Sequence, residues 1–98
     1  MAEITWTSGA IDRLREIHEY IAIDNPQSAA RVVAGIYSKV QLLLTFPELG
    51  QRYEPITDRH VREIIFGNYR IPYLLTGDGD ILILGVFHSA MDIDTYLN

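Results

Sequence analysis

The sequence predicts an α+β domain: a first strand, then an antiparallel helical hairpin packed on an antiparallel β-sheet, with a short helix at the C-terminal end. Residues 9–46 carry apolar side chains at three- and four-residue spacing, which is the period of an amphipathic helix. Residues 60–87 instead contain three apolar runs separated by two glycine-containing turns, the pattern of an antiparallel meander. With 98 residues and no repeat or linker, we expect one domain over residues 1–98.

The first half of the chain predicts one strand and two helices. Ile4-Thr5-Trp6 is a short strand, and the side-chain oxygen of Thr7 or Ser8 can cap the helix that follows. That helix covers about residues 9–23, with its apolar stripe formed by Ile11, Leu14, Ile17 and Ile21.

A second helix begins after the turn at Asp24. Asn25 is a good N-cap and Pro26 is tolerated at the first helical position. The apolar stripe continues to Phe46, where Pro47 ends it. Because the connection between the two helices is short, they form an antiparallel hairpin.

The second half predicts three strands, over residues 60–66, 69–75 and 81–87. Gly67-Asn68 makes a tight hairpin between the first two, and residues 76–80 make the next turn. Pro72 cannot donate to a strand ladder, so we expect it at a bulge or at an outward-facing position. The apolar residues after Ser89 indicate the short final helix: Met91, Ile93, Tyr96 and Leu97.

Composition excludes several classes of protein. There is no cysteine, so disulfides and thiolate chemistry are absent. His18 and His60 have no second histidine at ligand spacing, so we expect no metal site, and we expect no cofactor. The start of the chain lacks the features of a signal peptide, and no apolar run reaches the ~18 residues of a membrane span. These features predict a cytoplasmic protein without membrane contact.

The net charge of −5 argues against direct nucleic-acid binding, which usually relies on a basic surface. The charge is uneven, however. Residues 52–70 hold four arginines against three acids: Arg52, Arg59, Arg62 and Arg70 against Glu54, Asp58 and Glu63. They form either a small basic patch on an acidic body or a set of arginines paired with neighbouring acids.

Five short motifs occur in order along nearly the whole chain. They are Asn25-Pro26, Pro47-Glu48-Leu49-Gly50, Arg62-Glu63, Tyr69-Arg70-Ile71-Pro72-Tyr73 and Val86-Phe87-His88. Each is weak alone, but together, at this spacing and chain length, they resemble the RelE/ParE toxin superfamily. The resemblance implies the fold predicted above and the toxin of a type II toxin–antitoxin pair.

Two activities compete within that superfamily. RelE-like members are endoribonucleases that cut mRNA in the ribosome, whereas ParE-like members bind and poison DNA gyrase without catalysis. The long second helix and the acidic charge of this chain are more similar to the ParE side. The resemblance therefore implies a cognate antitoxin as partner and DNA gyrase as target. The large apolar stripes suggest a homodimer when the antitoxin is absent. A non-toxic homologue that keeps only the fold is a third reading.

On the ParE-like reading the chain has no catalytic residue. On the ribonuclease reading the nominal candidates are Arg62, Arg70, His88 and Tyr53, since RNA cleavage needs a base, an acid and cations for the phosphate. The chain has only one lysine, Lys39, and Met91 stands where many relatives have an arginine. Structural roles are the alternatives: a hydrogen bond for His88, a salt bridge for Arg62, including one with Asp92, and core positions for Tyr69 and Tyr73.

Overall fold

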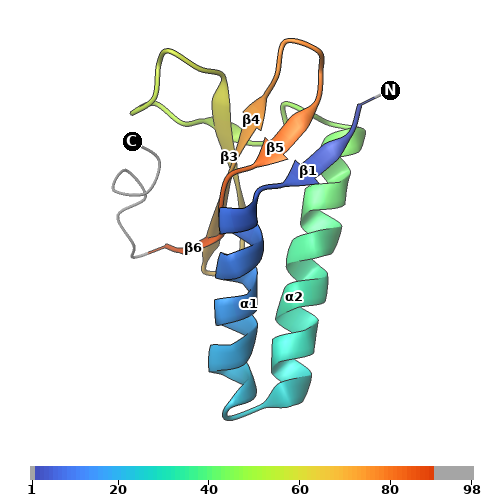
Figure 1. Ribbon diagram of the computed structural model, residues 1–98, viewed down its shortest axis with the longest axis vertical. Coiled ribbons are helices and arrows are strands. Elements are labelled where there is room, and N and C mark those ends of the chain that lie inside the picture. Colours follow the sequence, from blue (N-terminus) through green and yellow to red (C-terminus); the bar gives the residue numbers. More distant parts are fainter. Residues whose placement is uncertain (1, 90–98) are drawn as a thin grey trace.

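The computed structural model describes residues 2–89, in which two helices lie against one face of a six-stranded sheet (Figure 1). The strand order is β1-β5-β4-β3-β2, and β6 also pairs with β4. The expected C-terminal helix, Met91 and Asp92 lie outside the described residues. Figure 1 shows that the part of the helical hairpin next to the α1–α2 turn extends beyond the sheet.

The helical hairpin forms where the sequence predicts it. Helix α1 spans Ser8–Ala22, and the Thr7 side chain accepts a hydrogen bond from the backbone of Ala10. Helix α2 spans Pro26–Gln41, and Asn25 caps it by accepting from the backbone of Ser28. A 3₁₀ turn, η1 (Leu42–Leu44), continues α2 towards Phe46. Both predicted N-caps and the Pro26 start are confirmed.

The first strand joins the sheet in parallel. Strand β1 (Ile4–Trp6) pairs with β5 (Ile81–Ile83), in register Ile4 to Ile81. Thr7 follows directly, and its Oγ1 donates to the carbonyl of Ile83 at 2.8 Å. One hydroxyl therefore both caps α1 and fixes the start of that helix to the sheet. The sheet is mixed for this reason, although its central meander is antiparallel as predicted.

The meander consists of β3 (Val61–Phe66), β4 (Tyr69–Leu75) and β5. Gly67 has a φ of 57°, which places a left-handed residue first in the two-residue hairpin. Gly79 has a φ of 86° in the next turn. Strand β2 (Gln51–Arg52) pairs with β3, in a segment for which the sequence predicts no strand.

The last predicted strand, 81–87, is interrupted. Ile83 pairs with Tyr73 and Phe87 pairs with Arg70, so three residues on one strand oppose two on β4, and β6 (Phe87–His88) follows this bulge. The carbonyl of Pro72 accepts from Leu84 at 2.9 Å, so the side of Pro72 without an N–H faces the bulge. The expected position of Pro72 at a bulge is confirmed, and the expectation of a continuous strand is wrong.

Alternation along β3 separates two environments. Ile64 packs in the main core between the helices and the sheet, with Ile36, Val40, Ile71 and Tyr73. Val61 belongs to a second buried cluster with Tyr53, Ile56 and Phe87, on the opposite face of the sheet. Even-numbered side chains of β3 therefore face the helices, and odd-numbered ones face away. This alternation decides where the candidate site residues lie.

Candidate functional site

Two side chains hold the Pro47–Gly50 turn against the helix-facing side of the sheet. The Tyr73 hydroxyl donates to the Pro47 carbonyl at 2.8 Å and accepts from the Gly50 N–H at 3.0 Å. Arg62 lies opposite Tyr73 on β3 and donates to the Gly50 carbonyl at 2.6 Å. Burial raises the pKa of the Tyr73 phenol, and the hydrogen bond from Gly50 offsets part of that rise. We call Arg62 and Tyr73 the turn clamp.

The turn clamp also engages His60, which the sequence analysis left without any partner. The Arg62 Nε donates to the His60 Nε2 at 3.0 Å. Arg62 additionally donates to the Glu48 carbonyl at 3.4 Å. Within residues 2–89 the guanidinium thus binds backbone carbonyls and the His60 ring and forms no salt bridge, while Asp92, the other partner considered for it, lies outside the described residues.

Arg70 lies on the other face of the sheet. Its guanidinium pairs with the Glu63 carboxylate through three contacts: Nη2 to Oε2 at 2.8 Å, Nε to Oε2 at 3.0 Å and Nη2 to Oε1 at 3.1 Å. The guanidinium carbon is 6.0 Å from the centre of the Tyr53 ring. With Arg59 also within 3.8 Å of Asp58, neighbouring acids balance two arginines of the basic segment.

His88 occupies a third place. It pairs with Tyr69 across β4 and β6, and the two rings meet edge to face with centroids 5.9 Å apart. It is exposed and lines a hollow beside α1 with Arg13 and Glu16. His88 thus ends β6 directly after the buried Phe87, and Tyr69 and Tyr73 pack in or against the core as expected.

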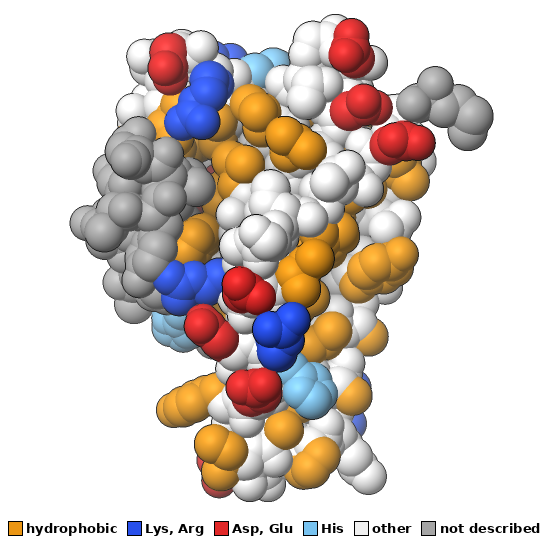
Figure 2. All heavy atoms as spheres, viewed as in Figure 1, with side chains coloured by type: hydrophobic (Ala, Val, Ile, Leu, Met, Phe, Trp, Pro, Cys, Tyr) orange, Lys and Arg blue, Asp and Glu red, His pale blue; other side chains and the backbone are white. Residues whose placement is uncertain are grey.

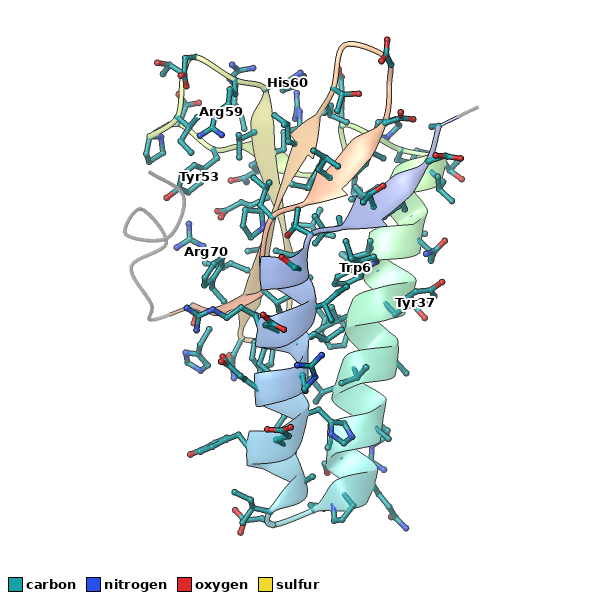
Figure 3. All side chains as sticks on the ribbon, viewed as in Figure 1. Trp6, Tyr37, Tyr53, Arg59, His60 and Arg70 are labelled. Atoms are coloured by element: carbon teal, nitrogen blue, oxygen red, sulfur yellow. The ribbon has the colours of Figure 1, made fainter. Side chains whose placement is uncertain are left out.

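The structure brings together two of the four candidate residues of the ribonuclease reading. Tyr53 and Arg70 lie on the same side of the sheet, as Figure 3 shows. Arg62 projects from the opposite face towards the Pro47–Gly50 turn, and His88 lies beside α1. A base, an acid and a cation must reach one phosphate group together to cleave RNA. This arrangement does not place the four at one phosphate.

The outer side of the helical hairpin carries a shallow apolar groove of about 260 Å³, which we call the hairpin groove. Residues of both helices line it: Ile11, Leu14, Arg15, His18 and Val33. Ile11 is 45% exposed, and Tyr37 on α2 is 53% exposed. Figure 2 shows hydrophobic side chains at the surface along the hairpin. A groove between two helices with an apolar floor is suited to an amphipathic helix.

A larger cavity of about 670 Å³ opens next to the turn clamp, and we call it the Phe46 cavity. It lies between the segment after η1 and the β4–β5 turn, and its lining is Thr45, Phe46, Pro47, Glu48, Leu49, His60, Leu75, Thr76 and Gly79. No feature of the sequence was interpreted above as predicting this cavity. The available signal was the run of apolar residues beyond the end of the helical period, including Phe46 and Leu49, which are 56% and 44% exposed.

The chain is similar in sequence and in fold to known proteins. The family model described as "ParE toxin of type II toxin-antitoxin system, parDE" matches residues 4–93. This chain belongs to the ParE toxin family. It is 41% identical over 88 residues to the protein named "Putative toxin Y4kP" of Sinorhizobium fredii (strain NBRC 101917 / NGR234), which covers 88% of each chain. The fold is that of a solved structure titled "Chromosomal ParDE TA system from P. aeruginosa", with a TM-score of 0.74, 23% identity, and coverage of 90% of this chain and 96% of that one.

Membership of the ParE toxin family confirms the predicted superfamily and its ParE side, and so assigns the chain to the toxins of type II toxin–antitoxin systems. Four of the five motifs that carried the resemblance contact one another, and Asn25-Pro26 instead starts α2. The Pro-x-x-Gly turn is bound by Arg62 and Tyr73, while Glu63 binds Arg70. In this ParE-family chain the motifs thus build the fold. Within residues 2–89, no helix is long and apolar enough to cross a membrane, and no three His, Asp or Glu side chains gather as metal ligands.

Proposed function

We propose that this chain inhibits DNA gyrase by binding to it, and that a cognate antitoxin neutralises it. The observation that carries the proposal is the separation of Arg62, His88 and the Arg70–Tyr53 pair in a chain of the ParE family. Inhibition by binding needs only a complementary surface, whereas RNA cleavage needs the four groups at one phosphate. The place of action would be the cytoplasm, where gyrase works.

The hairpin groove is the proposed antitoxin site. Its apolar residues lie on two adjacent helices, so a partner helix can bury an apolar stripe along both. Helix α2 carries Arg31 and Lys39 and no acid, so acidic side chains on that flank of the partner would be favoured. A segment that folds only on this groove would stabilise the toxin by mass action.

Induction of this chain in cells tests the proposal. We expect growth arrest, blocked replication and gyrase-dependent DNA damage, with mRNA intact and with growth restored by co-expression of the antitoxin. Purified chain should inhibit supercoiling by purified gyrase. Ribosome-dependent mRNA cuts that disappear in both Arg70→Met and His88→Ala variants would instead establish the endoribonuclease. A folded chain that does not affect growth would establish the non-toxic homologue.

Without antitoxin, we propose that two copies associate through the hairpin groove. Ile11 exposes apolar surface in the groove, and Tyr37 exposes more on α2, one helical turn beyond Val33 of the groove. A two-fold dimer would cover both surfaces at once. Light scattering should report a dimer that the antitoxin converts to a toxin–antitoxin complex. Tyr37→Glu should give a monomer, because it places a charge in the apolar contact. A wild-type monomer at high concentration would refute self-association.

A further inference from the structure

We propose that the Phe46 cavity is a docking pocket for a protein segment that presents an arginine or lysine beside a large apolar side chain. Resting on the proposed function, we assign that segment to the target of the toxin, and the antitoxin to the hairpin groove. The volume of about 670 Å³ accommodates several side-chain groups of a partner.

The walls of the cavity are held in place before any partner arrives. On one side, the turn clamp fixes the Pro47–Gly50 turn through hydrogen bonds of 2.6, 2.8 and 3.0 Å. On the other, the backbone of Thr76 donates to the Asp80 carbonyl at 2.9 Å, and its hydroxyl accepts from the Asp80 N–H at 3.0 Å. A preformed pocket avoids part of the entropy cost of ordering an interface, so a single anchor residue can contribute strongly.

The apolar part of the lining supplies the contact area. Phe46 and Leu49 are each close to half exposed, and Leu42 and Leu44, just before them, are also exposed. Four large apolar side chains within eight residues of chain therefore meet solvent at one end of the molecule. Exposed apolar surface of this density is typical of protein–protein contact sites, and it selects a bulky apolar side chain as one half of the anchor.

Charge selects the other half of the anchor. Among the described residues that line the cavity, Glu48 is the only acid, and there is no lysine or arginine. The turn that contributes Thr76 and Gly79 also carries Asp78 and Asp80. Arg62 is engaged with carbonyls and with His60. A cationic side chain is therefore favoured at this rim, and a phosphate backbone is disfavoured, which makes the partner a protein.

The two surfaces suit different partners. The Phe46 cavity and the hairpin groove share no lining residue. The groove runs between two helices, so it fits a helix that folds on binding. The Phe46 cavity is larger and lies between two turns, so it fits projecting side chains of a folded protein. A toxin must be recognised by both an antitoxin and a target. Separate surfaces allow each contact to be changed alone.

Two matched pairs of variants test the assignment. Glu48→Lys reverses the charge of the rim, and Glu54→Lys makes the same change at an exposed acid outside the cavity. Phe46→Ala removes the apolar wall, and Tyr20→Ala removes an aromatic ring elsewhere that is 78% exposed, against 56% for Phe46. Each is assayed for supercoiling inhibition with purified gyrase, for growth arrest in cells, and for co-purification with the antitoxin.

Glu48→Lys and Phe46→Ala should each raise the inhibitory concentration by about tenfold or more. Both control variants should keep an inhibitory concentration within about twofold of the wild-type value. All four variants should bind the antitoxin and melt at the same temperature as the wild type. Wild-type potency in both cavity variants would overturn the proposal, as would loss of antitoxin binding with inhibition retained. If the wild type arrests growth without inhibiting gyrase, gyrase is not the target. Growth arrest by the two cavity variants and their two controls then tests whether the cavity binds the target. A wild type that neither arrests growth nor inhibits gyrase would overturn both the proposed function and the proposed pocket.

Discussion

Arg62 and Arg70 come from the two motifs at the centre of the sequence, yet they act on opposite faces of the sheet. Arg62 faces the helices and donates to backbone carbonyls of the Pro47–Gly50 turn. Arg70 faces away from them and binds a carboxylate, that of Glu63. Because side chains alternate along a strand, the consecutive residues Arg62 and Glu63 belong to two separate structures.

The difference lies in what each arginine organises. A bond from Arg62 positions main chain, so it fixes the path of a turn and the wall of the Phe46 cavity. The Glu63–Arg70 pair joins two side chains that are 16% and 27% exposed, and solvent and salt can partly replace it. Changes on the helix-facing side should therefore cost more stability than changes on the other face.

The largest effect is expected at Gly50, where the turn meets β3. A Cβ at this position would collide with the Glu63 carbonyl oxygen, a main-chain atom that cannot move alone. Gly50→Ala should lower the free energy of unfolding by about 3 kcal/mol. Gly77→Ala is the control, since it meets open space, and should change stability by less than about 1 kcal/mol. Urea unfolding measures both, and equal stability of the two variants would refute the tight contact.

Next comes the hydroxyl of the turn clamp. Tyr73→Phe leaves the ring in the core but removes the partner of the Pro47 carbonyl and of the buried Gly50 N–H. Because these two groups lose their partner, the free energy of unfolding should fall by about 2 kcal/mol. Tyr37→Phe, at an exposed tyrosine, should be close to neutral. If denaturant unfolding gives the two variants the same stability, the clamp does not contribute as its geometry indicates.

Local patterns were sufficient to predict most of the fold. Asn25, Pro26 and Gly67 act within a few residues of themselves, so their sequence context alone indicates the cap, the helix start and the hairpin. Pro72 was expected at a bulge because the missing N–H follows from its own chemistry. In each of these cases the physical cause lies in the residue itself or in its immediate neighbours in the chain.

The site depends on contacts that no local pattern contains. Arg62 binds a turn that is twelve residues away in the chain, and Tyr73 binds Pro47 over twenty-six. Periodicity placed these side chains on a strand face but could not say which partner would meet them. The Phe46 cavity was missed for the same reason, since two distant turns form its walls. Parallel pairing of β1 likewise depends on where the whole hairpin packs.

A smaller effect is expected from the ion pair on the other face. A double-mutant cycle with Glu63→Gln and Arg70→Met should give a coupling energy of about 1 kcal/mol, because the paired contacts are short but partly solvated. The coupling should shrink as salt increases. Urea unfolding of the four proteins at low and high salt measures it. A coupling that salt does not change would place the pair in a drier environment than its exposure indicates.

The smallest effect concerns alkaline pH and separates the two faces by titration. Burial raises the pKa of Tyr73 in the folded chain above its unfolded value of about 10. Tyr73 therefore contributes stability that is fully present below about pH 10 and is lost as pH rises through the folded pKa, because only the unfolded chain ionises easily. Tyr73→Phe lacks this titration, so the stability gap between wild type and variant should narrow above about pH 10. The Glu63–Arg70 pair lies on the other face of the sheet, so it should leave this gap unchanged. Urea unfolding at about pH 8 and about pH 10.5 checks this, and parallel losses in the two proteins would show that Tyr73 ionises as readily in the folded chain as in the unfolded one.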